Sequence, residues 1–284
     1  VILSIVEFIK NVIYTGGYLM RKLFITISKT ILFFVGWAVL VGFTPDIPTD
    51  NPAILRLGWE FTPLLTIIVF TLVFVFVLEK RNIKVPIFND FYKNFFIGIV
   101  TGFLWLGSVV VILMLTGIMV IQGENKVEYI LIWMLSSLLN VVMQELLIRG
   151  YLYQLFKKNY NAIISGFLTT ILFTAMHGGA FEAGIIPVLN IITMSIFVIL
   201  LLEYTGTLLA PIIVHFVWNT IGCIILGGVS LASDYPNLLN SIFKGNILLS
   251  GGIYKIEGSI IVLVINILLI VTFFLLNKNK NSKN

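Results

Sequence analysis

Residues 129–156 read YILIWMLSSLLNVVMQELLIRGYLYQLF, an apolar run whose only charged side chains are Glu145 and Arg149. An apolar run of about 20 residues is long enough to cross a lipid bilayer as a helix. Ionisable side chains inside a bilayer are costly unless they pair or face the interior of a bundle. The stretch therefore predicts a membrane-spanning helix whose polar side chains turn towards other helices.

The whole chain has the same character as this stretch. Of its 284 residues, 59% are hydrophobic and 11% are charged, whereas a soluble domain averages about 25% charged residues. No hydrophilic stretch is long enough to build a separate soluble domain. We therefore predict one integral membrane domain over residues 1–284, all-α in class and located in the cell membrane.

The apolar runs predict eight membrane-spanning helices in one bundle, since each is close to the length that a bilayer requires. Residues 1–20 are also apolar, but Glu7 and Lys10 interrupt them, which favours a helix at the membrane surface over a ninth span. The eight expected spans are 24–44, 61–79, 95–121, 129–156, 161–177, 185–203, 207–228 and 258–276.

The basic residues orient these spans. The net charge is +5, and the Lys and Arg clusters lie at alternate ends of successive spans, as an even number of crossings with both termini in the cytoplasm requires. Clusters that flank apolar segments act on membrane orientation and are not a nucleic-acid surface. A long external loop is expected at 229–257 and a basic cytoplasmic tail at 277–284. The clusters are Arg21-Lys22, Lys80-Arg81-Lys84, Lys157-Lys158 and Lys278-Lys280-Lys283.

A few polar residues in the spans stand out from the serines and threonines that bond to their own helix. Glu145 and Arg149 are four residues apart and share one helical face, so they can form a structural ion pair. His215 and Asn219 have the same spacing, and His177 closes the fifth span. Each feature alone is compatible with a purely structural link between helices.

Together, these groups suit hydrolysis of a peptide bond. A carboxylate can take a proton from water, imidazoles can position that water, and an amide can stabilise an oxyanion. His177 and His215 are the only histidines, and the single Cys223 excludes an intramolecular disulfide and a cysteine-based metal cluster. No cofactor is expected.

Three motifs in order carry a resemblance to a known family. They are Glu145-Leu-Leu-Ile-Arg149, Phe173-Thr-Ala-Met-His177 and His215-Phe-Val-Trp-Asn219, all within the motif-bearing helices at 129–228. The chain resembles the CAAX protease and bacteriocin-processing (CPBP, or Abi) family of intramembrane proteases. The resemblance implies an eight-helix membrane endopeptidase of the glutamate type, formerly described as a metalloprotease. Its substrates would be peptides such as pheromone or bacteriocin precursors, or lipidated CAAX-like proteins.

The resemblance also implies a role for each motif residue. The family motif starts with two adjacent glutamates, of which the first is the proposed general base. The histidines at positions 177 and 215 would hold the attacking water or the substrate carbonyl. Asn219 would contribute to the oxyanion site, while Glu145 and Arg149 would support it.

This sequence departs from the family pattern at Gln144, which stands where the first glutamate is expected. A neutral amide accepts hydrogen bonds but has no basicity near neutral pH, so it cannot act as a general base. Three explanations are open. The residue is a deliberate Glu→Gln replacement that inactivates a folded protease, or the chain is a natural pseudoprotease that binds a peptide, for example as an immunity protein. In the third explanation, Glu145 serves as the general base after an adjustment of the helix.

Two further alternatives involve the same residues. A proton-coupled transporter could use Glu145 and the histidines as a relay, although the chain lacks the internal repeats that mark many transporters. A zinc ion could bind His177, His215 and Glu145, since catalytic zinc takes three protein ligands. No His-Glu-x-x-His spacing supports zinc, and Arg149 already offers Glu145 a partner.

Overall fold

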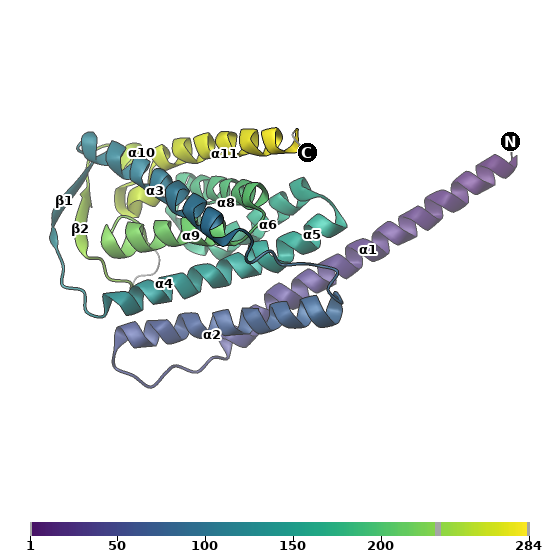
Figure 1. Cartoon of the computed structure of the whole chain (residues 1–284), viewed down its shortest axis with the longest axis horizontal. Helices are drawn as coiled ribbons and strands as arrows, with labels where there is room; N and C mark the ends of the chain where they lie inside the picture. The colour runs from purple at the N-terminus through teal and green to yellow at the C-terminus, as the bar shows by residue number, and fades with distance from the viewer. Residues whose placement is uncertain (1, 231–233, 283–284) are drawn as a thin grey trace.

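The computed structural model describes residues 2–230 and 234–282, and it is a bundle of helices with one small sheet (Figure 1). Nothing is described of side chains before Gly17 or at position 281. The α-helices are α1 (Ile2–Gly42), α2 (Pro52–Leu72), α3 (Phe91–Leu115), α4 (Ile130–Glu145), α5 (Tyr153–Asn159), α6 (Ala162–Met176), α7 (Gly178–Ala183), α8 (Ile185–Thr205), α9 (Leu209–Asn219), α10 (Ile247–Ser250) and α11 (Ile260–Asn281). Three π-helical segments (η1, Val73–Leu78; η2, Leu146–Leu152; η3, Thr220–Ile225) and a 3-10 helix (η4, Gly252–Gly258) extend or join them.

Eight apolar helical segments correspond to the eight predicted spans. Among the described residues, six helical segments are long and apolar enough to cross a membrane, and two shorter apolar segments complete the set. This confirms an all-α membrane bundle and a multi-pass membrane protein. The six are 17–42, 52–78, 91–115, 130–159, 185–205 and 252–280, and the shorter two are 162–176 and 209–225.

The N-terminal segment differs from the expectation. Helix α1 runs without a break from Ile2 to Gly42 and projects from the bundle at its N-terminal end (Figure 1). Residues 2–20 therefore form the first half of one long helix. No proline interrupts its backbone hydrogen bonds, and the helix continues through Gly16-Gly17. Their place at the membrane surface stays a prediction, and residue 1 lies outside the described part of the chain.

The sequence-based prediction missed a two-stranded antiparallel sheet. Strand β1 (Met119–Glu124) pairs with β2 (Leu239–Phe243), with Met119 opposite Phe243 (Figure 1). The expected span at 95–121 was too long, because the chain leaves α3 at Leu115 and turns at Gly117, whose φ of 71° suits glycine. The predicted loop at 229–257 is likewise partly ordered as β2, α10 and η4; its residues 231–233 are not described.

The helices pack in pairs that surround the motif helices. Helix α2 lies along α4, α3 packs on α9, and α8 packs on α11. Helix α4 in turn packs on α9, and α6 packs on η2. Consequently the motif-bearing helices lie at the centre of the bundle, with α2, α3 and α11 around them.

Two glycines let α3 approach α9 closely. Gly98 and Gly102 form a Gly-x-x-x-Gly pattern, which is typical of tight helix pairs in membranes. A Cβ atom at Gly98 would lie 2.8 Å from the Ile213 Cβ and 3.1 Å from the Ala210 carbonyl oxygen. A Cβ at Gly102 would lie 3.0 Å from the Val217 Cβ. Because α9 carries His215 and Asn219, this contact also positions the site.

We expect Gly98→Ala to lower the melting temperature of the purified protein, because the added methyl group would push against the Ala210 backbone. Overpacking of this kind typically costs about 1–3 kcal/mol. Gly107→Ala on the same helix is the matched control, since nothing lies within 4 Å of a Cβ there. It should leave stability unchanged or raise it slightly. Thermal unfolding in detergent measures both, and equal effects would contradict the close-packing argument.

Candidate active site

The motif residues come from three parts of the chain that meet inside the bundle. Gln144 and Glu145 end α4, and Arg149 follows in η2. His177 directly follows α6, while His215 and Asn219 lie on α9. All six residues singled out from the sequence thus gather in one region.

Glu145 is the centre of this region. Its Oε1 accepts a hydrogen bond from Arg149 Nη1 at 2.6 Å, and His215 Nδ1 lies 2.9 Å from the same oxygen. Glu145 and Arg149 have no exposed surface, at 0% each. A carboxylate buried this completely needs a counter-charge. Glu145 is therefore held between a guanidinium and an imidazole, and the pair formed with Arg149 is the one that the spacing predicts.

Phe173 links the second motif to this cluster in two ways. Its ring lies against the Arg149 guanidinium, at 4.6 Å from ring centre to Cζ, which is a cation–π contact. Its backbone carbonyl oxygen lies 2.8 Å from His177 Nδ1. One residue thus covers the buried cation and orients the histidine that follows four positions later.

The partners of the two histidines define their tautomers when neutral. A carbonyl oxygen only accepts, so His177 must carry its proton on Nδ1. His215 Nδ1 faces the Glu145 carboxylate in the same way. The remaining ring nitrogen, Nε2, is then an acceptor in both residues. Either acceptor can hold one hydrogen of a water molecule, which leaves the other hydrogen available to a base.

A cavity of about 460 Å³ lies against these residues. Gln144, His177, His215 and Asn219 line it, whereas Glu145 and Arg149 do not. Neighbouring positions on a helix point about 100° apart, so Gln144 faces the cavity while Glu145 faces the packed interior. The site thus separates into a group in contact with the cavity and a supporting pair behind it.

The cavity wall is partly aromatic and partly polar. The rings of Trp105 and Trp218 stack with centroids 4.0 Å apart. Trp105 Nε1 donates to Asn266 Oδ1 at 2.7 Å, and this bond ties α3 to α11 within the wall. An apolar wall with a few polar groups is typical of sites that bind small organic groups or peptide side chains.

Two widened helical turns begin directly after motif residues. The π-helical segment η2 starts after Glu145, and η3 starts after Asn219. Turns of this type are rare and often lie at functional sites, because the extra residue per turn redirects side chains. Here they change the helical phase where α4 and α9 meet.

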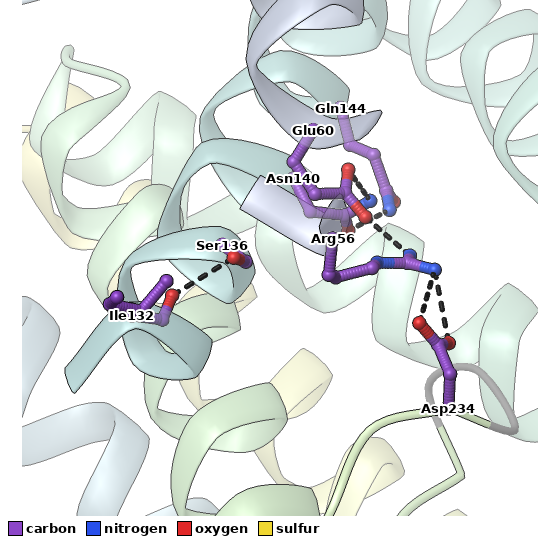
Figure 2. Close-up of polar contacts among 7 residues, drawn as sticks. All are labelled: Arg56, Glu60, Ile132, Ser136, Asn140, Gln144 and Asp234. Atoms are coloured by element: carbon purple, nitrogen blue, oxygen red, sulfur yellow. Dashed lines mark hydrogen bonds and ion pairs between the residues drawn. The ribbon is translucent and has the colours of Figure 1, made fainter. Parts of the chain in front are cut away.

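A second, partly buried ion pair lies at the cavity, and it was not expected from the sequence. Arg56 and Glu60 lie four residues apart on α2; Arg56 lines the cavity, and Glu60 is 3% exposed. Asn140 lines the cavity as well and bonds both Glu60 and Gln144 (Figure 2). The four-residue spacing of Arg56 and Glu60 is the same as that of Glu145 and Arg149, so the sequence does contain a signal for this pair. Both residues precede the second expected span, which begins at 61.

A zinc ion at His177, His215 and Glu145 stays an untested alternative. Arg149 Nη1 and His215 Nδ1 both lie within hydrogen-bond distance of Glu145 Oε1. A metal ion bound to this oxygen would have to compete with these two nitrogen atoms. Within residues 2–230 and 234–282, no group of three His, Cys, Asp or Glu residues could hold a metal ion. The donor set therefore does not fit zinc as it stands, and no catalytic step is assigned to a metal.

Residues 126–221 match the family described as type II CAAX prenyl endopeptidase Rce1-like, which is 96 of the 284 residues. This segment contains all three motifs, together with Asn140. The match supports the CPBP family, a class of membrane endopeptidases, as the motifs had indicated. No curated protein and no solved structure match the chain.

We expect Arg149→Met to destabilise the protein strongly, because it leaves the Glu145 carboxylate buried without its counter-charge. Breaking such a pair typically costs about 3–5 kcal/mol. Adding Glu145→Gln should recover part of the loss, since the orphaned charge is then gone. Thermal unfolding in detergent gives both values.

The control for this prediction is Lys157→Met, which breaks the partly exposed pair with Glu203. That change should cost less than about 1 kcal/mol. A loss for Arg149→Met no larger than for Lys157→Met would show that the buried pair does not brace the site.

Proposed function

We propose that this chain has the architecture of an intramembrane peptidase that hydrolyses a peptide bond, with an amide at the position of its general base. The observation that supports it is the cavity, where Gln144, His177, His215 and Asn219 converge while Glu145 and Arg149 brace them from behind. The family match over residues 126–221 points the same way. The substrate is a peptide, or a lipidated CAAX-like protein, that reaches the site from the membrane.

The proposed reaction uses the residues that line the cavity. A glutamate at position 144 takes one proton from a water whose other hydrogen is held by the Nε2 atom of His177 or His215. The water oxygen then bonds to the substrate carbonyl carbon, and the Asn219 side-chain amide donates to the resulting oxyanion. The carbon–nitrogen bond breaks, and the leaving amine receives the proton from position 144. Gln144 cannot make the first transfer, so the chain as it stands is expected to be severely impaired.

We expect Gln144→Glu to confer measurable cleavage of membrane-associated precursor peptides or of prenylated CAAX peptides. General-base catalysis is worth roughly 10²–10⁴-fold, which sets the size of the gain. Mass spectrometry of peptides incubated with purified protein in detergent is the measurement. The control adds His215→Ala to Gln144→Glu, which should return cleavage to background.

An absence of cleavage for every peptide in both backgrounds would count against the peptidase. It would favour the alternative of a peptide-binding or immunity protein. One observation supports that alternative: Gln144 lines the cavity, and its neutral amide can exchange hydrogen bonds with a ligand without any proton transfer.

We also propose that both termini are cytoplasmic and that the cavity opens to the opposite, outer side. The two termini lie at one end of the bundle and β1 and β2 at the other (Figure 1). Basic clusters gather at the end that holds the termini, which marks the cytoplasmic side. The cavity is lined instead by Arg56, Ser230, Tyr254 and Glu257 at the strand-bearing end. An outer opening favours an exported peptide over a cytoplasmic protein as substrate.

Cysteine labelling in intact cells tests this orientation. In a Cys223→Ala background, we expect Lys126→Cys to react with a membrane-impermeant maleimide from outside, since this side chain is 88% exposed at the strand-bearing end. Lys158→Cys, at the other end, should react only after lysis. The reverse pattern would place the cavity on the cytoplasmic side.

A further inference from the structure

A chain of hydrogen bonds runs from the cavity to α2, outside the three motifs. Gln144 Nε2 donates to Asn140 Oδ1 at 2.7 Å, and Asn140 Nδ2 donates to Glu60 Oε2 at 2.8 Å. Figure 2 shows the chain continuing through Arg56 to Asp234. Arg56 and Glu60 precede the segment that matches the family, so neither the motifs nor the match accounts for them.

Glu60 determines the direction of both hydrogen bonds that Asn140 makes in this chain. An ionised carboxylate only accepts hydrogen bonds, so Asn140 must turn its NH₂ group towards Glu60. The Asn140 oxygen then faces position 144, and the residue there must be a donor. Gln144 meets this requirement, because its NH₂ group faces Asn140. The orientation of both amides therefore follows from the chemistry of Glu60.

The Glu60 charge is itself held in place. Arg56 forms an ion pair with Glu60 on the same face of α2 and lies 3.1 Å from Asp234 Oδ1. The Arg56 guanidinium also covers the Tyr235 ring at 4.7 Å. One helical turn before Asn140, Ser136 bonds the carbonyl of Ile132 in its own helix and does not compete for Asn140 (Figure 2). Among the described residues, Asn140 is thus the link in this chain between Glu60 and Gln144.

We propose that Glu60 is a positioning residue. Acting through Asn140, it favours a hydrogen-bond donor at position 144. An ionised glutamate at position 144 would place two carboxylates on either side of one amide, which has a single NH₂ end. One carboxylate would then face the Asn140 oxygen inside the bundle. The negative charge can occupy position 60 or position 144, but not both.

This inference deepens the proposed function, since it assumes that position 144 holds the general base when the site is active. It adds that a neutral residue at position 60 favours the ionised base. Replacing Glu60 by Gln allows Asn140 to reverse, so that it donates to a carboxylate introduced at position 144 and accepts from the new amide at position 60. The two hydrogen bonds of Asn140, to position 144 and to position 60, are then restored with opposite direction.

A double-mutant cycle tests the coupling without any assay of activity. The full-length protein is compared with Gln144→Glu, Glu60→Gln and the double variant, by thermal unfolding in detergent. We expect Gln144→Glu alone to lower the melting temperature by roughly 3–8 °C, because it leaves a buried charge opposed to a carbonyl oxygen. In the Glu60→Gln background, the same change should cost less than half as much. Equal losses in the two backgrounds would overturn the proposal, and so would the absence of any loss.

The matched control is Glu79→Gln, another buried carboxylate near the far end of the same span. It bonds Lys29 and Tyr151, which lie outside the chain of bonds around Asn140. Its effect should add to that of Gln144→Glu without coupling. If Gln144→Glu does not fold, the double variant still tests the proposal, because the reversed bonds of Asn140 should let it fold. Failure of the double variant to fold would equally overturn the proposal.

A cleavage assay separates this inference from the proposed function. We expect the double variant Glu60→Gln, Gln144→Glu to cleave at least tenfold faster than Gln144→Glu alone. Equal cleavage by both would support the peptidase and overturn the role of Glu60. Coupled stabilities with no cleavage by any variant would support the role of Glu60 and count against the peptidase.

Discussion

The buried carboxylate of Glu145 is the constraint on which the rest of the site depends. It lies in a bundle interior with no exposed surface, where an unpaired charge would be very costly. Arg149 and His215 satisfy one oxygen of this group, and Arg149 also reaches Ser195 Oγ on α8 at 3.3 Å. One ion pair therefore ties α4, α8 and α9 together, and the cavity residues are held by helices that cannot shift independently.

Because of this ion pair, the adjacent residues Gln144 and Glu145 have different surroundings. Glu145 points into the packed interior and stabilises the site, while Gln144 lines the cavity and bonds Asn140. This arrangement argues against the explanation in which Glu145 serves as the general base after a helix adjustment. For Glu145 to reach the cavity, it would have to leave both Arg149 and His215, and the Arg149 charge would then be buried without a partner.

The cavity extends beyond the segment that carries the family resemblance. Helices α2, α3 and α11 contribute Arg56, Trp105 and Asn266 to its wall. The hydrogen bonds from Glu60 through Asn140 connect this outer part to position 144. The Gln144 amide fits these surroundings, because its NH₂ group faces the oxygen that Asn140 presents.

The sequence by itself determined what depends on local geometry. The lengths of the apolar runs predicted the eight helical segments, and the four-residue spacing predicted the pair of Glu145 and Arg149, because both follow from the helix repeat alone. The tertiary structure decided which groups meet across the bundle. It placed His215 on Glu145 rather than on Asn219, joined Glu60 to Gln144, and paired β1 with β2. These contacts join residues far apart in the chain, and the packing of helices, not a local repeat, brings them within hydrogen-bond distance.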